Sequence, residues 1–113
     1  MNDSTKLDLV GEDMRIVTQI LSLRVPDRPV YAFGSRATGQ ARRRSDLDLA
    51  IGGATPLTLR QRALLADDFE ESDLPIKVDV LDLNAVSPEF RQRIERDFIL
   101  IREGLPAAEQ VLV

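Results

Sequence analysis

The chain has 113 residues, no cysteine, no histidine and a formal net charge of −4. This length suits one domain with a single core. The missing histidines exclude serine–histidine and cysteine–histidine triads and the usual zinc sites, so any metal must be held by oxygen ligands, as Mg²⁺ is. The acidic balance argues against nonspecific nucleic-acid binding, and no apolar run is long enough for a membrane span.

The first half of the chain predicts a helix and two strands. Residues 5–23 read as a helix, with Leu7, Val10, Met14, Val17 and Leu21 on one face. A strand at 30–33, a turn of helix at 36–40 and a second strand at 46–51 follow. The arrangement indicates an α/β protein.

The second half predicts two more helices and two more strands. Thr55-Pro56 is expected to open a helix that runs to about Glu70. A third strand spans 76–83, a helix begins at Ser87-Pro88, and 99–101 forms a short edge strand. The apolar positions expected to face inward on these two helices are Leu59, Ala63, Ala66 and Phe69 on the first, and Phe90, Ile94 and Phe98 along the second. Residues 1–104 then form the domain, and 105–113 form a C-terminal tail.

Two aspartates stand out in the second strand. Successive side chains alternate between faces, so Asp46 and Asp48 share one face while Leu47 and Leu49 take the other. Two like charges roughly 7 Å apart are unfavourable unless a cation lies beside them. Mg²⁺ commonly uses one or two carboxylates together with substrate phosphates. The pair therefore predicts a divalent-cation site.

The segment before this strand predicts a phosphate site. Gly34 permits close approach of a phosphate to the backbone, and the hydroxyl and amide of Ser35 can donate to its oxygens. We do not expect Ser35 to be a covalent nucleophile, because no histidine is present to activate it. Arg36, Arg42 and the arginines at 43 and 44 cluster beside the carboxylates, which suits a triphosphate better than a long polyanion.

The motif Gly34-Ser35, ten residues, Asp46-x-Asp48 resembles the nucleotidyltransferase superfamily that includes DNA polymerase beta, and within it the small minimal nucleotidyltransferase (MNT) branch. Residues 73–84 look like the third acidic strand of that family, and 90–104 look like its closing helix and strand. The resemblance implies the polymerase beta palm-like fold, a small mixed sheet with helices packed mainly on one face. It also implies that Asp46, Asp48 and Asp79 bind metal and carry catalysis.

The third carboxylate is a choice between two positions on one strand. Period-2 counting places Lys77, Asp79 and Leu81 on one face, and Val78, Val80 and Asp82 on the other. The valines are suited to burial against helices, which leaves Asp79 facing the site as a general base or a third metal ligand. Asp82 is expected to serve a turn with Asn84.

The resemblance also implies a function. MNT proteins are antitoxins that transfer AMP from ATP to a tyrosine of a partner HEPN ribonuclease toxin, with Mg²⁺ as cofactor. The implied partner is that toxin, in a hetero-oligomer. Two alternatives stay open: a non-catalytic antitoxin that acts by occlusion, and a small-molecule nucleotidyltransferase completed by another subunit. The N-terminus lacks the layout of a signal peptide, and we expect a cytoplasmic protein.

Overall fold

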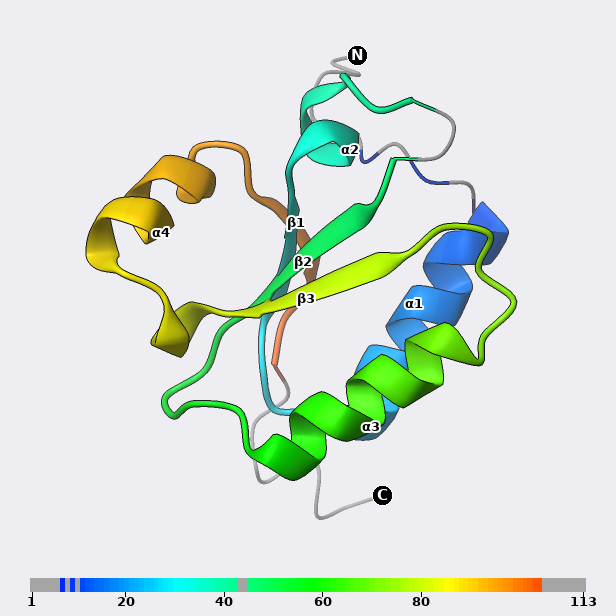
Figure 1. Ribbon diagram of the computed structural model, residues 1–113, viewed down its shortest axis with the longest axis horizontal. Coiled ribbons are helices and arrows are strands. Elements are labelled where there is room, and N and C mark those ends of the chain that lie inside the picture. The colour runs from blue at the N-terminus through cyan, green and yellow to red at the C-terminus, as the bar shows by residue number, and fades with distance from the viewer. Residues whose placement is uncertain (1–6, 8, 10, 43–44, 105–113) are drawn as a thin grey trace.

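A computed structural model describes residues 7, 9, 11–42 and 45–104. Its elements in chain order are α1 (Gly11–Arg24), β1 (Val30–Phe33), α2 (Ser35–Thr38), β2 (Leu47–Ile51), α3 (Leu59–Glu70), β3 (Val78–Asp82), the 3₁₀ turn η2 (Leu83–Ala85), α4 (Pro88–Glu95) and β4 (Ile99–Arg102). Figure 1 shows the strands at the centre, with α1 and α3 lying together on one side and α4 on the other. The four predicted strands are confirmed.

The sheet is mixed, with strand order β3-β2-β1-β4. β1 pairs antiparallel with both β2 and β4, whereas β2 pairs parallel with β3. A parallel pair needs a crossover connection, and α3 supplies it. The predicted edge strand is β4, and β3 forms the opposite edge.

The main core lies between the sheet and the two longest helices. Alternation along β2 buries Leu47, Leu49 and Ile51 fully on this side. They pack with the other buried members of the cluster, which are Val17, Leu21, Val25, Val30, Ala32, Leu57, Leu65 and Phe69. Burial of this much apolar surface is the main source of stability for a domain of this size. It leaves the opposite sheet face available for polar chemistry.

The opposite face carries a smaller, aromatic cluster under α4. Ala50, Leu83 and Ile94 are buried there. Tyr31 and Phe98 stack with ring centroids 4.7 Å apart, and Phe33 meets Phe98 at 6.4 Å. Ser87 caps α4 and Pro88 begins it, as predicted from the sequence. Both faces are therefore covered in part, with the two longer helices together on one of them.

Two helix starts differ from the predictions. Helix α1 begins at Gly11; part of the predicted range from residue 5 lies outside the described residues. Helix α3 begins at Leu59, capped by Thr58 in a reciprocal pair of hydrogen bonds with Gln61. The prediction that Thr55-Pro56 opens this helix is wrong, because the carbonyl of Thr55 accepts hydrogen bonds from Arg28 and Asn84 instead.

The prediction of which residues form the inner face of α3 is also largely wrong. Leu59 is 86% exposed, and Ala63 and Ala66 are exposed as well. The buried stripe is Leu65 and Phe69, four residues apart, so only Phe69 was assigned correctly. No helix in the described part of the chain is long and apolar enough to cross a membrane.

Asp82 ties the end of β3 to the connection before α3. Its side chain is fully buried. It accepts the N–H of Leu57 at 2.8 Å and the N–H of Asn84 at 2.9 Å, and Arg62 lies 3.5 Å away. The predicted turn with Asn84 is confirmed, but the residue also anchors a segment 25 positions earlier. Asp82 is therefore a structural residue, which the period-2 pattern alone did not show.

We expect Asp82→Ala to lower the free energy of unfolding by about 2–4 kcal/mol, because two backbone N–H groups lose a charged acceptor inside the fold. Urea unfolding followed by circular dichroism measures the change. The matched control is Asp79→Ala on the same strand, whose side chain is exposed and should cost less than about 0.5 kcal/mol. Equal losses for the two variants would contradict the anchoring role.

Candidate functional site

Two carboxylates meet at adjacent positions of β2 and β3. The parallel register pairs Asp48 with Asp79 directly, and Phe33 of β1 lies across from Asp48 on the other side. Neighbouring strands are about 4.8 Å apart, so the two side chains leave the sheet side by side. Asp46 precedes β2 by one residue and is exposed. The fold therefore brings together Asp48 and Asp79, which are 31 positions apart in the sequence, and places Asp46 at the start of the same strand.

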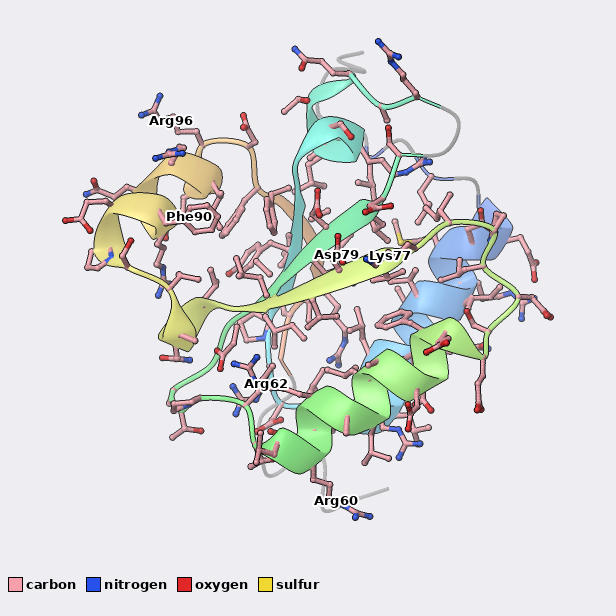
Figure 2. All side chains as sticks on the ribbon, viewed as in Figure 1. Arg60, Arg62, Lys77, Asp79, Phe90 and Arg96 are labelled. Atoms are coloured by element: carbon pink, nitrogen blue, oxygen red, sulfur yellow. The ribbon has the colours of Figure 1, made fainter. Side chains whose placement is uncertain are left out.

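The face of each residue on β3 follows the predicted alternation. Val78 and Val80 pack against the main core, while Leu81 packs against the aromatic cluster on the other side. Asp79 is exposed, with 49% of its side chain accessible to solvent, and Lys77 Nζ lies 3.6 Å from Asp79 Oδ1. Figure 2 shows both side chains on the open side of β3. Sequence reasoning placed Lys77 on this face but gave it no role.

Gly34 sits directly against Asp48. Its φ of 78° falls in the left-handed region that favours glycine. A Cβ atom at this position would collide with the carboxylate of Asp48. The Gly34 carbonyl accepts the N–H groups of Ala37 and Thr38, which turns the chain from β1 into α2. Glycine is thus required twice, for backbone conformation and for the close approach.

The surroundings of Asp48 disfavour its charged form. The pKa of Asp48 is raised above its ordinary value, first by burial and then by the negative charges of Asp79 and Asp46. A bound cation would relieve all three effects, and the available donors are oxygen atoms of the kind that Mg²⁺ prefers. Asp46, Asp48 and Asp79 therefore fit a divalent cation chemically.

The side chains are not arranged as a closed metal cage. Among the described residues, no three acidic groups gather closely enough to enclose an ion as they stand. Asp79 points to Lys77 instead, and Asp46 is open to solvent. The ligand set of Asp46, Asp48 and Asp79 accordingly stays a prediction.

The residues predicted to bind phosphate occupy different environments. Ser35 begins α2 beside Gly34 and is partly exposed. Arg36 is buried, and its Nε donates to the Ser45 carbonyl at 3.0 Å, with Nη2 3.4 Å from the Arg42 carbonyl. It thereby holds the connection that leads into β2. The Arg42 backbone N–H donates to Ser45 Oγ at 2.7 Å, and the residue is exposed. Residues 43 and 44 lie outside the described part.

The family follows from the comparison with known proteins. Residues 17–104 match the family model described as "Polymerase beta, Nucleotidyltransferase". The chain belongs to the polymerase beta nucleotidyltransferase family. The match spans the sheet, the carboxylate pair and the Gly34–Ser35 turn, so the resemblance expected from the sequence is confirmed, together with the nucleotidyltransferase fold.

Individual relatives agree with this assignment. A probable protein adenylyltransferase, MntA of Haemophilus influenzae, is 45% identical over 110 residues, which cover 97% of this chain and 96% of the relative. A crystal structure of a toxin–antitoxin with AMP-PNP superposes with a TM-score of 0.67 at 26% identity, covering 87% of this chain and 78% of that one. A mutant of the toxin–antitoxin MntA–HpeT gives a TM-score of 0.65 at 25% identity, covering 91% and 80%.

We expect Asp48→Asn to raise the melting temperature of the cation-free protein at pH 7. Because the folded-state pKa of Asp48 is raised, the contribution of this one carboxyl group to stability is fully present below the ordinary value of 3.8 and is lost as the pH rises through the raised value. Asparagine carries no charge, so the variant avoids this loss of stability at pH 7. Its rise in melting temperature over the wild type should therefore shrink towards zero below pH 3.8. Thermal unfolding in a chelator at both pH values measures it, with the exposed Asp67→Asn as control. A lower melting temperature at pH 7 would show that the carboxylate is structurally paired.

Proposed function

We propose that this protein is a Mg²⁺-dependent protein adenylyltransferase that acts as an antitoxin, transferring AMP from ATP to a tyrosine of a partner HEPN ribonuclease toxin. The observation that carries the proposal is the register that sets Asp48 beside Asp79, next to the Gly34–Ser35 turn. The name of the 45% identical Haemophilus relative supports protein adenylylation. The likeness to a toxin–antitoxin crystallised with AMP-PNP supports both the nucleotide and the kind of partner.

In this proposal, Asp46 and Asp48 would bind the cation, and Asp79 would be its third ligand. When bound, Mg²⁺ would neutralise charge on the α-phosphoryl group and on the departing pyrophosphate. Gly34 lets the triphosphate come close to the backbone, because no side chain stands between it and Asp48. The hydroxyl of Ser35 donates to phosphate oxygens.

The acceptor chemistry needs a base on the open side of the site. The tyrosine oxygen attacks the α-phosphorus, the bond from that phosphorus to the bridging oxygen breaks, and pyrophosphate leaves. Asp79 is positioned to take the phenolic proton, because it is exposed on the face that carries Asp48. Arg36 acts by positioning, since it holds the connection before Asp46. Arg42 is exposed and available to phosphate.

The organisation of the protein follows from this role. Residues 1–104 would supply the catalytic domain, and the partner, bound in a hetero-oligomer, would supply the acceptor. We place the pair in the cytoplasm, where a ribonuclease toxin meets its substrates and ATP is abundant.

We expect Asp79→Asn to reduce AMP transfer by roughly 10²–10⁴-fold, because the amide cannot accept the acceptor's proton. Transfer is measured by incubating α-labelled ATP, Mg²⁺ and the partner with each variant. Asp48→Asn should be equally impaired, whereas the exposed Asp67→Asn should retain activity. Undiminished transfer by Asp48→Asn or Asp79→Asn would overturn the assignment of the site.

A second experiment separates catalysis from occlusion. The partner is incubated with a substoichiometric amount of this protein plus Mg²⁺-ATP, the protein is stripped away, and ribonuclease activity is measured. We expect inactivation that persists, needs ATP and is absent with Asp48→Asn, because a covalent change outlasts the complex. Full recovery of ribonuclease activity on removal of the protein would favour neutralisation by occlusion.

A further inference from the structure

A groove runs along the edge of the sheet between α3 and β3. It consists of two adjoining cavities of about 480 and 300 Å³. Ala66, Lys77 and Val78 line both of them, so the two form one continuous depression. The first cavity extends towards Phe69 and Ile76, and the second ends at Asp79. The groove therefore leads from the far end of α3 to the carboxylate that we propose as the base.

This edge is the open approach to the site. On the β1 side of Asp48, the approach is bordered by Phe33 and the α2 turn. Further along the strands, α4 covers the face of the sheet that carries the aromatic cluster (Figure 1). On the other side, β3 is the last strand of the sheet, and among the described residues it pairs only with β2. An acceptor hydroxyl that must reach Asp79 therefore has its clearest path across β3.

The lining of the groove has a definite chemistry. Its floor is apolar, formed by partly buried Val78 and Val80 with Ala66 of α3. Arg62 from α3 and Lys77, the residue before β3, line the cavity that ends at Asp79 (Figure 2). Arg62 contacts Asp82 and Lys77 contacts Asp79, yet their side chains are 47% and 72% exposed. A guanidinium has five N–H donors and an ammonium three, so both cations can bind a further anion.

We propose that this groove docks the acceptor-bearing segment of the partner protein. The segment would place its hydroxyl at Asp79, an apolar side chain on the floor at Ala66, and an acidic side chain between Arg62 and Lys77. The inference rests on the proposed function for the hydroxyl at Asp79. Two observations support this occupant. The groove is continuous with the site, and the cations Arg62 and Lys77 near Asp79 complement an acidic group, whereas the acidic Glu70 lines the other cavity.

Ala66→Glu is the variant that tests the groove. Ala66 is exposed on α3, so a longer side chain does not disturb the core. The new carboxylate lies one helical turn from Arg62, with which it can pair, and it would fill the groove and repel an acidic segment. Ala63→Glu is the matched control, because Ala63 is exposed on the same helix outside the groove. Circular dichroism checks that both variants fold.

The measurement is steady-state AMP transfer to the partner, together with calorimetric titration of the partner. For Ala66→Glu we expect the KM for the partner and its Kd to rise at least about tenfold, with the KM for ATP unchanged. Ala63→Glu should match the wild type. Raising the salt concentration should weaken partner binding by the wild type more than by Ala66→Glu, since the variant has already lost the ionic contact.

The outcomes separate this inference from the proposed function. If the wild type transfers AMP and Ala66→Glu is equal to it, or if Ala63→Glu is impaired equally, the groove is not the docking site. If the wild type binds the partner without modifying it while Ala66→Glu still weakens binding, docking in the groove stands and protein adenylylation is wrong. A rise in the KM for ATP alone would show that the groove belongs to the nucleotide.

Discussion

The site depends on the register of three strands. β2 is flanked by an antiparallel β1 and a parallel β3, and the pairing sets Phe33, Asp48 and Asp79 in one row across the sheet. A slip of one residue between β2 and β3 would turn Asp79 towards α3 and a valine towards the site, because side chains alternate with period two. Burial of Val78 and Val80 against the main core opposes such a slip. The hydrophobic pattern of β3 therefore holds the acidic pair in place.

The two faces of the sheet divide structural and chemical roles. Buried leucines and valines under α1 and α3 supply the stability, which allows the other face to keep carboxylates whose charges repel. Gly34 brings the backbone against Asp48, where any side chain would collide. The raised pKa of Asp48 shows that its negative charge is unfavourable in these surroundings, and a nearby positive charge would stabilise it. The burial and repulsion that raise this pKa cost some stability locally, as expected at a functional site.

Much of this arrangement could be predicted from the sequence because it depends on local periodicity. The alternation in β2 and β3 predicted which aspartates face the site, and the Ser87-Pro88 pair predicted the start of α4. The start of α3 could not be predicted in this way, because Thr55-Pro56 has the composition of a helix cap. Contacts from distant residues override that composition.

Several of the features that were missed involve hydrogen bonds of polar side chains to backbone carbonyls elsewhere in the chain. Arg28 is buried and donates to the carbonyls of Gly52, Thr55 and Pro56. No local sequence pattern predicts that it would hold this distant segment. Arg36 was expected at phosphate, yet it donates to the Ser45 carbonyl. The groove beside β3 likewise arises only when α3 and β3 pack together. Sequence patterns identified the carboxylates, whereas three-dimensional contacts were needed to see how the surrounding segments are held.

The geometry of the site predicts that a metal–nucleotide complex binds between Gly34–Ser35 and the Asp48–Asp79 pair. The most direct test of this prediction is the paramagnetic broadening of backbone amide signals when Mn²⁺ and AMP-PNP are added to isotopically labelled protein. We predict that broadening is strongest at Gly34, Asp48 and Asp79, and that it is lost in Asp48→Asn. Broadening centred on other acidic residues, such as Glu71 and Asp73, with Asp48 unaffected, would contradict binding at the Asp48–Asp79 pair.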